Sequence, residues 1–137
     1  MKKVAIIGAG ISGLFIANLF KKNPNFHVTI FEKNSSVALE QGYGVQLSVN
    51  SIRILNEIGF KKFENNEKFT PKKICFYSNE NSSKICELDI TEFNSESCKY
   101  TTLKRSSLIN FLKSDLEGLI RTGYNISKID QKDKKIK

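Results

Sequence analysis

The first 32 residues carry a hydrophobic pattern that predicts a strand, a helix and a second strand. Residues 4–7 are wholly apolar and end at a glycine, which is typical of a strand buried on both faces of a parallel sheet. Residues 11–22 place apolar side chains at helical spacing, and the Asn-Pro-Asn turn at 23–25 ends this helix. Residues 27–31 are β-branched and aromatic, which favours a strand that ends at Glu32. The pattern predicts one βαβ unit, with the right-handed crossover expected of such units.

The pattern then departs from a plain nicotinamide-binding domain, which would continue at once with a helix and a third parallel strand. A short apolar strand is predicted at 45–48. It is followed by an amphipathic helix over 52–58, which ends at Gly59. Two β-type segments, 72–78 and 84–90, flank a polar loop and predict a hairpin.

The C-terminal third predicts an extended segment at 100–103 and a helix over 105–119. Its apolar stripe consists of Leu108, Leu112, Leu116 and Leu119, and Gly118 and Gly123 help to end it. From Tyr124 the tail alternates isoleucine with charged residues, and the chain stops at Ile136-Lys137 within an expected strand. Because such an ending leaves an open sheet edge, we expect the N-terminal part of a longer protein or a shortened reading frame.

The composition fits one globular domain without nucleic-acid chemistry. The chain has 137 residues, 39% hydrophobic and 26% charged, with ten Phe and four Tyr. Its net charge of +8 comes from 22 basic and 14 acidic residues. Only Arg53, Arg105 and Arg121 are arginines, whereas planar recognition of phosphates and bases favours arginine over lysine. We therefore interpret the excess of lysines as charged side chains that mainly keep the surface solvated, and we expect no nucleic-acid partner.

Several other classes of site and segment are excluded. Cys75, Cys86 and Cys98 match neither a CxxC redox pair nor a zinc site, so reduced thiols in a cytoplasmic protein are expected. The single histidine, His27, leaves no set for a metal centre or a histidine-assisted nucleophile. Residues 4–20 mimic a signal peptide, but their glycines and the missing cleavage site argue against a leader or a membrane span.

The strongest chemical motif is the GxGxxG sequence between the first strand and the helix. Gly8 permits the tight turn, Gly10 lets the backbone approach a pyrophosphate, and Gly13 lets the helix pack close to the sheet. The helix N-terminus, with Ile11 and Ser12, offers unpaired N–H groups and a partial positive charge to phosphates. In this context the motif predicts a dinucleotide-binding site.

Glu32 completes the fingerprint, because it stands at the end of the second strand, 19 residues after Gly13. Its carboxylate can accept hydrogen bonds from both ribose hydroxyls, and its charge disfavours a 2′-phosphate, hence NADP, at this site. Arg105 is the first residue of a predicted helix, where the positive end of the helix dipole disfavours its charge. A nearby anion would offset this cost, but a side chain that points to solvent explains the residue equally well. Gly42 and Gly44 could approach a ligand, although a simple turn explains them slightly better.

Taken together, these segments resemble the group A flavoprotein monooxygenases, the flavin-dependent aromatic hydroxylases. The resemblance is carried by VAIIGAGISGL at 4–14, FEK at 31–33, GYGVQLSVNSIRILNEIGF at 42–60 and LKRSSLINFL at 103–112. It extends over essentially the whole chain. It implies an α/β fold, in which a Rossmann-like FAD-binding βαβ unit is joined by part of an antiparallel substrate-domain sheet.

By this resemblance, residues 1–70 and 104–137 form the dinucleotide-binding portion, and 71–103 begin the substrate domain, the whole being an incomplete domain. The residues implied to bind FAD are Gly8, Gly10, Ile11, Ser12, Gly13, Glu32, Lys33, Val45 and Arg105. Of these, Val45 would line the flavin and Arg105 would contact the cofactor from its helix. Lys33 and Leu39 stand where the family usually has arginine, and the family's later Asp-Gly and Gly-Asp motifs lie beyond Lys137.

The implied activity is hydroxylation of a small aromatic molecule by FAD, with NAD(P)H as the reducing co-substrate and O₂ as the oxidant. The cofactor itself would carry out that chemistry. The sequence indicates neither a catalytic side chain nor an oligomeric state. Two alternatives stay open: another FAD-dependent oxidoreductase, such as an amine oxidase or a dehydrogenase, and an inactive truncated nucleotide-binding remnant.

Overall fold

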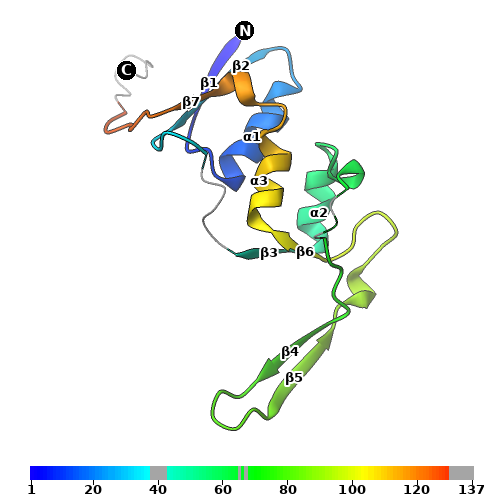
Figure 1. Ribbon diagram of the computed structural model, residues 1–137. Helices are drawn as coiled ribbons and strands as arrows, with labels where there is room; N and C mark the ends of the chain where they lie inside the picture. Colours follow the sequence, from blue (N-terminus) through cyan, green and yellow to red (C-terminus); the bar gives the residue numbers. More distant parts are fainter. Residues whose placement is uncertain (38–42, 65, 67, 130–137) are drawn as a thin grey trace. The chain divides into compact units, whose positions relative to one another are not determined.

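The computed structural model describes residues 1–37, 43–64, 66 and 68–129 (Figure 1). The chain divides into two compact units, one formed by residues 1–41 with 109–137 and the other by residues 42–108. The predicted positions Leu39, Gly42 and Ile136 lie outside the described residues. The two units are described in turn.

The first unit contains a three-stranded parallel sheet, one complete helix and residues 109–113 of a second helix. The predicted βαβ unit is confirmed as β1 (Lys2–Ile7), α1 (Ile11–Lys21) and β2 (Phe26–Glu32). The third strand is β7 (Ile120–Thr122), drawn in orange in Figure 1, which pairs in parallel with β2 to give the order β1-β2-β7. The third parallel strand is therefore present, but it is supplied by a distant part of the chain.

Apolar burial holds the first unit together. Its fully or almost fully buried apolar side chains are Ala9, Leu14, Ala17, Val28, Ile30, Ile109, Leu112 and Leu116. Burial of an aliphatic side chain of this size contributes about 1.5–3 kcal/mol each. Asn18 adds a polar link, because its Nδ2 donates to the carbonyl oxygens of Leu14 at 2.9 Å and Leu112 at 2.7 Å.

The second unit contains two antiparallel strand pairs. β3 (Gly44–Leu47) pairs with β6 (Thr101–Lys104), and β4 (Lys73–Tyr77) pairs with β5 (Lys84–Asp89) in the predicted hairpin. The amphipathic helix is confirmed as α2 (Val49–Asn56). The short 3₁₀ turns η1 (Phe60–Lys62) and η2 (Thr91–Phe93) connect these elements. The buried apolar residues are Ile52, Leu55, Phe60, Ile90, Leu103 and Leu108.

One prediction near the C-terminus was wrong, and the strand expected at the end of the chain lies outside the described residues. The helix expected over 105–119 is α3 (Arg105–Lys113), followed by the 3₁₀ turn η3 (Glu117–Leu119). Ser114 Oγ donates to the Phe111 carbonyl oxygen, and such local bonding competes with the helical ladder. Leu116 is fully buried although it lies after the end of the helix. The apolar spacing of the leucines therefore indicated burial correctly but not the length of the helix. In the described part of the tail, residues 124–129 form no strand.

Candidate functional site

The turn between β1 and α1 requires glycine at two positions. Gly8 has φ +98°, a conformation that other residues rarely adopt, and its N–H donates to the Phe31 carbonyl oxygen at 2.8 Å. A Cβ on Gly13 would lie 2.1 Å from the Gly8 carbonyl oxygen. This distance confirms a close approach of α1 to the first strand, as the motif predicts.

Gly10 is in a different position, because it faces open space. It caps the N-terminus of α1 with extended backbone, and a Cβ there would meet nothing within 4 Å. The first N–H that donates into the helix is that of Leu14, to the Gly10 carbonyl oxygen at 2.9 Å. The N–H groups of Ile11, Ser12 and Gly13 therefore have no partner within α1, and the cap has no side-chain hydrogen bond. This end of the helix presents donors and positive dipole to a region that an anion can enter.

Glu32 is 8% exposed and stands at the end of β2, beside this turn. Its Oε2 accepts from the Ala9 N–H at 2.9 Å, and its Oε1 accepts from the Asn34 N–H at 3.0 Å. The Asn34 N–H, followed by the Ala9 N–H and the charge of Lys33, lowers the pKa of Glu32, although burial opposes the shift. The carboxylate is ionised at neutral pH. Each oxygen accepts one backbone N–H and retains a lone pair for a ligand hydroxyl.

The segment after β7 also supports Glu32, which the sequence pattern did not indicate. The N–H of Tyr124 donates to the Glu32 carbonyl oxygen at 2.9 Å, and that of Gly123 donates to the Asn34 carbonyl oxygen at 2.8 Å. The rings of Phe31 and Tyr124 meet edge to face, with their centroids 5.6 Å apart. The strand end that presents Glu32 is thereby fixed by residues about ninety positions later in the chain.

The remaining predicted site residues are only partly placed with these groups. Lys33 is exposed next to Glu32. Val45 is half-buried on β3, and Arg105 opens α3, where its N–H donates to the Tyr43 carbonyl oxygen at 3.0 Å. Val45 and Arg105 belong to the second unit, whereas the glycine turn belongs to the first. Their roles at a cofactor therefore stay predictions.

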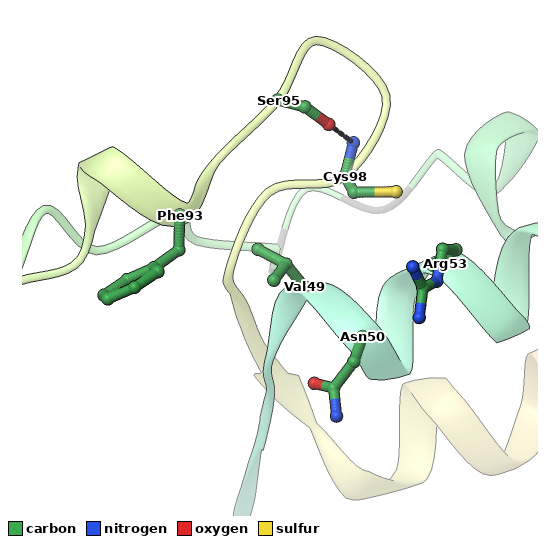
Figure 2. Close-up of a pocket in the computed structure, with 6 residues that line it drawn as sticks. All are labelled: Val49, Asn50, Arg53, Phe93, Ser95 and Cys98. Atoms are coloured by element: carbon green, nitrogen blue, oxygen red, sulfur yellow. Dashed lines mark hydrogen bonds between the residues drawn. The ribbon is translucent and has the colours of Figure 1, made fainter.

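The second unit has a cavity of its own, of about 220 Å³, that no sequence motif indicated (Figure 2). It is lined by Val49, Asn50, Arg53, Phe93, Ser95 and Cys98. Figure 2 shows Val49, Asn50 and Arg53 on α2 and the loop with Ser95 and Cys98 opposite them. The Cys98 N–H donates to Ser95 Oγ at 3.1 Å, which holds this loop. The lining combines a guanidinium and an amide with the apolar groups of Val49 and Phe93.

The structure also shows which further sites its described residues lack. Within residues 1–37, 43–64, 66 and 68–129, no three His, Cys, Asp or Glu side chains are arranged to hold a metal ion. In the same part of the chain, no helix has the length and apolar character needed to span a membrane. The glycine turn with Glu32 is therefore the strongest candidate site.

Comparison with known proteins supports this choice. The family described as an NAD(P)-binding Rossmann-like domain matches residues 6–40, which contain the glycine turn and Glu32. Over 58 residues, 42% of this chain, the sequence is 41% identical to the FAD-dependent monooxygenase anuJ of Penicillium roqueforti (strain FM164). This chain spans only 7% of the length of that relative.

Solved structures show the same fold over nearly the whole chain. A 2-methyl-3-hydroxypyridine-5-carboxylic acid oxygenase matches with a TM-score of 0.72 and 21% identity, covering 90% of this chain and 32% of its own. Klebsiella pneumoniae HpxO, complexed with FAD and uric acid, matches with a TM-score of 0.70 and 15% identity. This match covers 94% of this chain and 32% of the HpxO chain.

The first unit has a Rossmann-like fold with the glycine turn, and the second unit contains small antiparallel strand pairs. The particular resemblance expected from the sequence, to flavin-dependent monooxygenases, is confirmed by these sequence and structural relatives.

Proposed function

We propose that this chain binds FAD and forms the FAD-binding part of a flavin-dependent monooxygenase. The observation that carries the proposal is the open space at Gly10, where α1 begins with N–H groups that have no partner within the helix, together with the buried, ionised Glu32 that accepts from the neighbouring Ala9 N–H. The named sequence relatives are FAD-dependent monooxygenases, which supports FAD as the dinucleotide.

The residues present fit the ADP portion of FAD. Its pyrophosphate would accept hydrogen bonds from the first N–H groups of α1, and the lack of a side chain at Gly10 would admit it. Its ribose hydroxyls would donate to the lone pairs that Glu32 retains beside Ala9 and Asn34. Glu32 would repel the 2′-phosphate of NADPH, and FAD would occupy this site, so we place NAD(P)H, the reducing co-substrate, at another site. Bound FAD would supply the redox chemistry.

The wider assignment extends the same proposal. We assign residues 1–70 and 104–137 to the dinucleotide-binding portion and 71–103 to the beginning of a substrate domain, with Val45 and Arg105 directed to the flavin cofactor. The substrates would be O₂ and a small aromatic molecule. A cytoplasmic location is supported by the three cysteines, which are all free.

Reconstitution with FAD tests the proposal, with Gly10→Val as the decisive variant. The wild-type chain should quench flavin fluorescence and retain yellow colour after gel filtration. Gly10→Val should lose both, because the new side chain fills the space for the pyrophosphate, while loss of the glycine cap lowers its free energy of unfolding by only about 0.5–2 kcal/mol. Gly118→Val is the matched control, since a Cβ at Gly118 also meets nothing within 4 Å. A yellow, fully loaded Gly10→Val chain would refute the pyrophosphate placement.

Turnover separates the proposed activity from the alternatives. With the complete protein, consumption of NAD(P)H and O₂ that depends on an aromatic substrate supports a monooxygenase. Oxidation of an amine or alcohol without NAD(P)H would identify a different FAD oxidoreductase. A chain that binds no FAD, although it is folded by circular dichroism, would fit the truncated remnant instead.

A further inference from the structure

A second cavity of the 42–108 unit, of about 320 Å³, gathers positive charge. We call it the lysine cavity, because Lys61, Lys68 and Lys99 are among its lining residues. Among the described residues that line it, Glu96 is acidic, and Glu64 lies close enough to Lys68 to act on its charge, so the three lysines outnumber these two carboxylates. The volume lies at the lower end of the range of small-molecule sites.

Lys68 is held in place rather than solvated freely. Its Nζ lies 4.6 Å from the ring centroid of Phe60 and 5.0 Å from that of Phe63. It also donates a hydrogen bond to the Phe63 carbonyl oxygen. Burial lowers the pKa of Lys68, and the nearby charge of Glu64 only opposes this shift. An ammonium has three N–H donors, so this fixed cation keeps donors beyond the one used for Phe63.

Neutral donors complete the lining. Thr70 and Ser97 bring hydroxyl groups to the cavity. Thr101 is 7% exposed, and its Oγ1 donates to the Lys99 carbonyl oxygen at 2.8 Å, which fixes the backbone that carries Lys99. Elsewhere many lysines of this chain extend from the surface as general solvation. Here three of them line one concave surface together with hydroxyl groups, and one of the three cations is packed on two rings.

We propose that the lysine cavity binds a small dianion, a phosphate monoester or a dicarboxylate, through Lys61, Lys68 and Lys99. The Thr70 and Ser97 hydroxyls add neutral donors to its oxygens. This site is separate in sequence and in residue composition from the glycine turn, so the proposal stands independently of FAD binding.

Amide NMR of the full chain tests this, with inorganic phosphate, succinate and acetate as probes. Phosphate or succinate should shift the amides of residues 61, 68, 70, 97 and 99 in a saturable manner, and the monoanion acetate should bind about tenfold more weakly. Saturation by phosphate alone identifies a phosphate ligand, and equal saturation by succinate identifies a carboxylate ligand. Shifts confined to residues 8–13, or shifts that never saturate, would overturn the proposal.

Substitutions distinguish a site from diffuse charge. The Lys61→Met/Lys99→Met double variant should weaken phosphate or succinate binding about a hundredfold, because two charge-assisted contacts are removed. Lys62→Met/Lys72→Met removes the same charge from exposed lysines that are not among the lining residues and should change binding less than about twofold. Equal weakening in both pairs would show a general electrostatic effect and refute the lysine cavity. Both pairs keep Lys68, whose packing on Phe60 and Phe63 supports the fold.

Discussion

Gly10 and Gly13 belong to one short turn, yet a side chain at each would meet opposite surroundings. At Gly10 it would enter open space, and at Gly13 it would collide with the Gly8 carbonyl oxygen. The fold therefore requires the second glycine but not the first, and we propose that the first is required by a ligand. Under this proposal the motif combines a binding requirement at one glycine with a structural requirement at the other.

Gly13→Ala should destabilise the chain even without any cofactor. The new Cβ would stand 2.1 Å from a backbone oxygen, so α1 must move away from β1. We expect a loss of about 1–3 kcal/mol in the free energy of unfolding, the usual cost of overpacking. Urea denaturation measures it, with Gly118→Ala as the control in open space. Equal urea midpoints for the wild type and Gly13→Ala would contradict the close approach of α1 to the Gly8 carbonyl oxygen.

Glu32→Gln should change how stability depends on pH. The folded pKa of Glu32 lies below its usual value of 4.5, because the Asn34 and Ala9 N–H groups favour the ionised form. Its contribution is complete above the unfolded pKa and is lost as the pH falls through the folded pKa. The urea midpoint of the wild type should therefore fall below about pH 4.5, and Glu32→Gln should show less of this fall.

Glu117→Gln, at an exposed carboxyl in η3, is the control for this titration. The same steepness of the acid transition in Glu32→Gln as in the wild type would argue against an ionised, hydrogen-bonded Glu32.

At the scale of single elements, the β4–β5 hairpin separates charged and apolar side chains. Glu87 Oε1 lies 2.5 Å from Lys73 Nζ, and its Oε2 lies 2.7 Å from Lys84 Nζ. Ile74 pairs with Leu88, and Phe76 pairs with Cys86, at the alternate positions of the two strands. Alternation places Glu87, opposite Cys75, on the other face from these two pairs, whereas Lys84 pairs with Tyr77 beyond the register shift that follows Phe76.

The hairpin predicts an acid-shifted titration. Hydrogen bonds from Lys73 and Lys84 lower the pKa of Glu87 to about 2. In the Lys73→Met/Lys84→Met variant the titration should return towards 4.5. Carboxyl ¹³C chemical shifts measure both values. Since the triad is exposed, high salt should raise the wild-type pKa, and a salt-independent value near 4.5 would show that the contacts do not persist in solution.

At the scale of the whole molecule, the proposed FAD site draws on two stretches of the chain that form the first unit. Residues 1–41 supply the turn and Glu32, and β7 with its following residues supports the end of β2. Ligand binding should therefore stabilise both stretches together.

FAD and ADP should both raise the melting temperature, and ADP should compete with FAD. At about 100 times the Kd, binding adds about 2.7 kcal/mol to the free energy of unfolding. Hydrogen exchange should slow in α1, β2 and β7. Gly10→Val should show no ligand-dependent change. Stabilisation by FAD without competition from ADP would place the main contacts outside the glycine turn.

Much of the first unit could be predicted from the sequence, because its information is local. Three local signals indicate β1, α1 and β2: the periodicity of apolar residues, the Asn-Pro-Asn turn and the spacing of the glycines. Each depends on residues that are close together in the sequence. The hairpin and the opening of α3 at Arg105 followed from similar signals. The extent of α3 did not, since Leu116 is equally buried after the helix ends.

The glycine turn can be predicted from the amino-acid order alone, with Gly13 where a side chain cannot fit and an acid at the end of the next strand. Three features emerge only when the chain is folded: Ile120–Thr122 completes the sheet, Glu32 also anchors Ala9 and Asn34, and three lysines line one cavity. The difference lies in the range of the interactions. Local conformational preferences depend on neighbouring residues and can be recognised in the sequence. These three features depend instead on contacts between segments that are distant in the chain, and a three-residue strand is too short to give a recognisable sequence pattern.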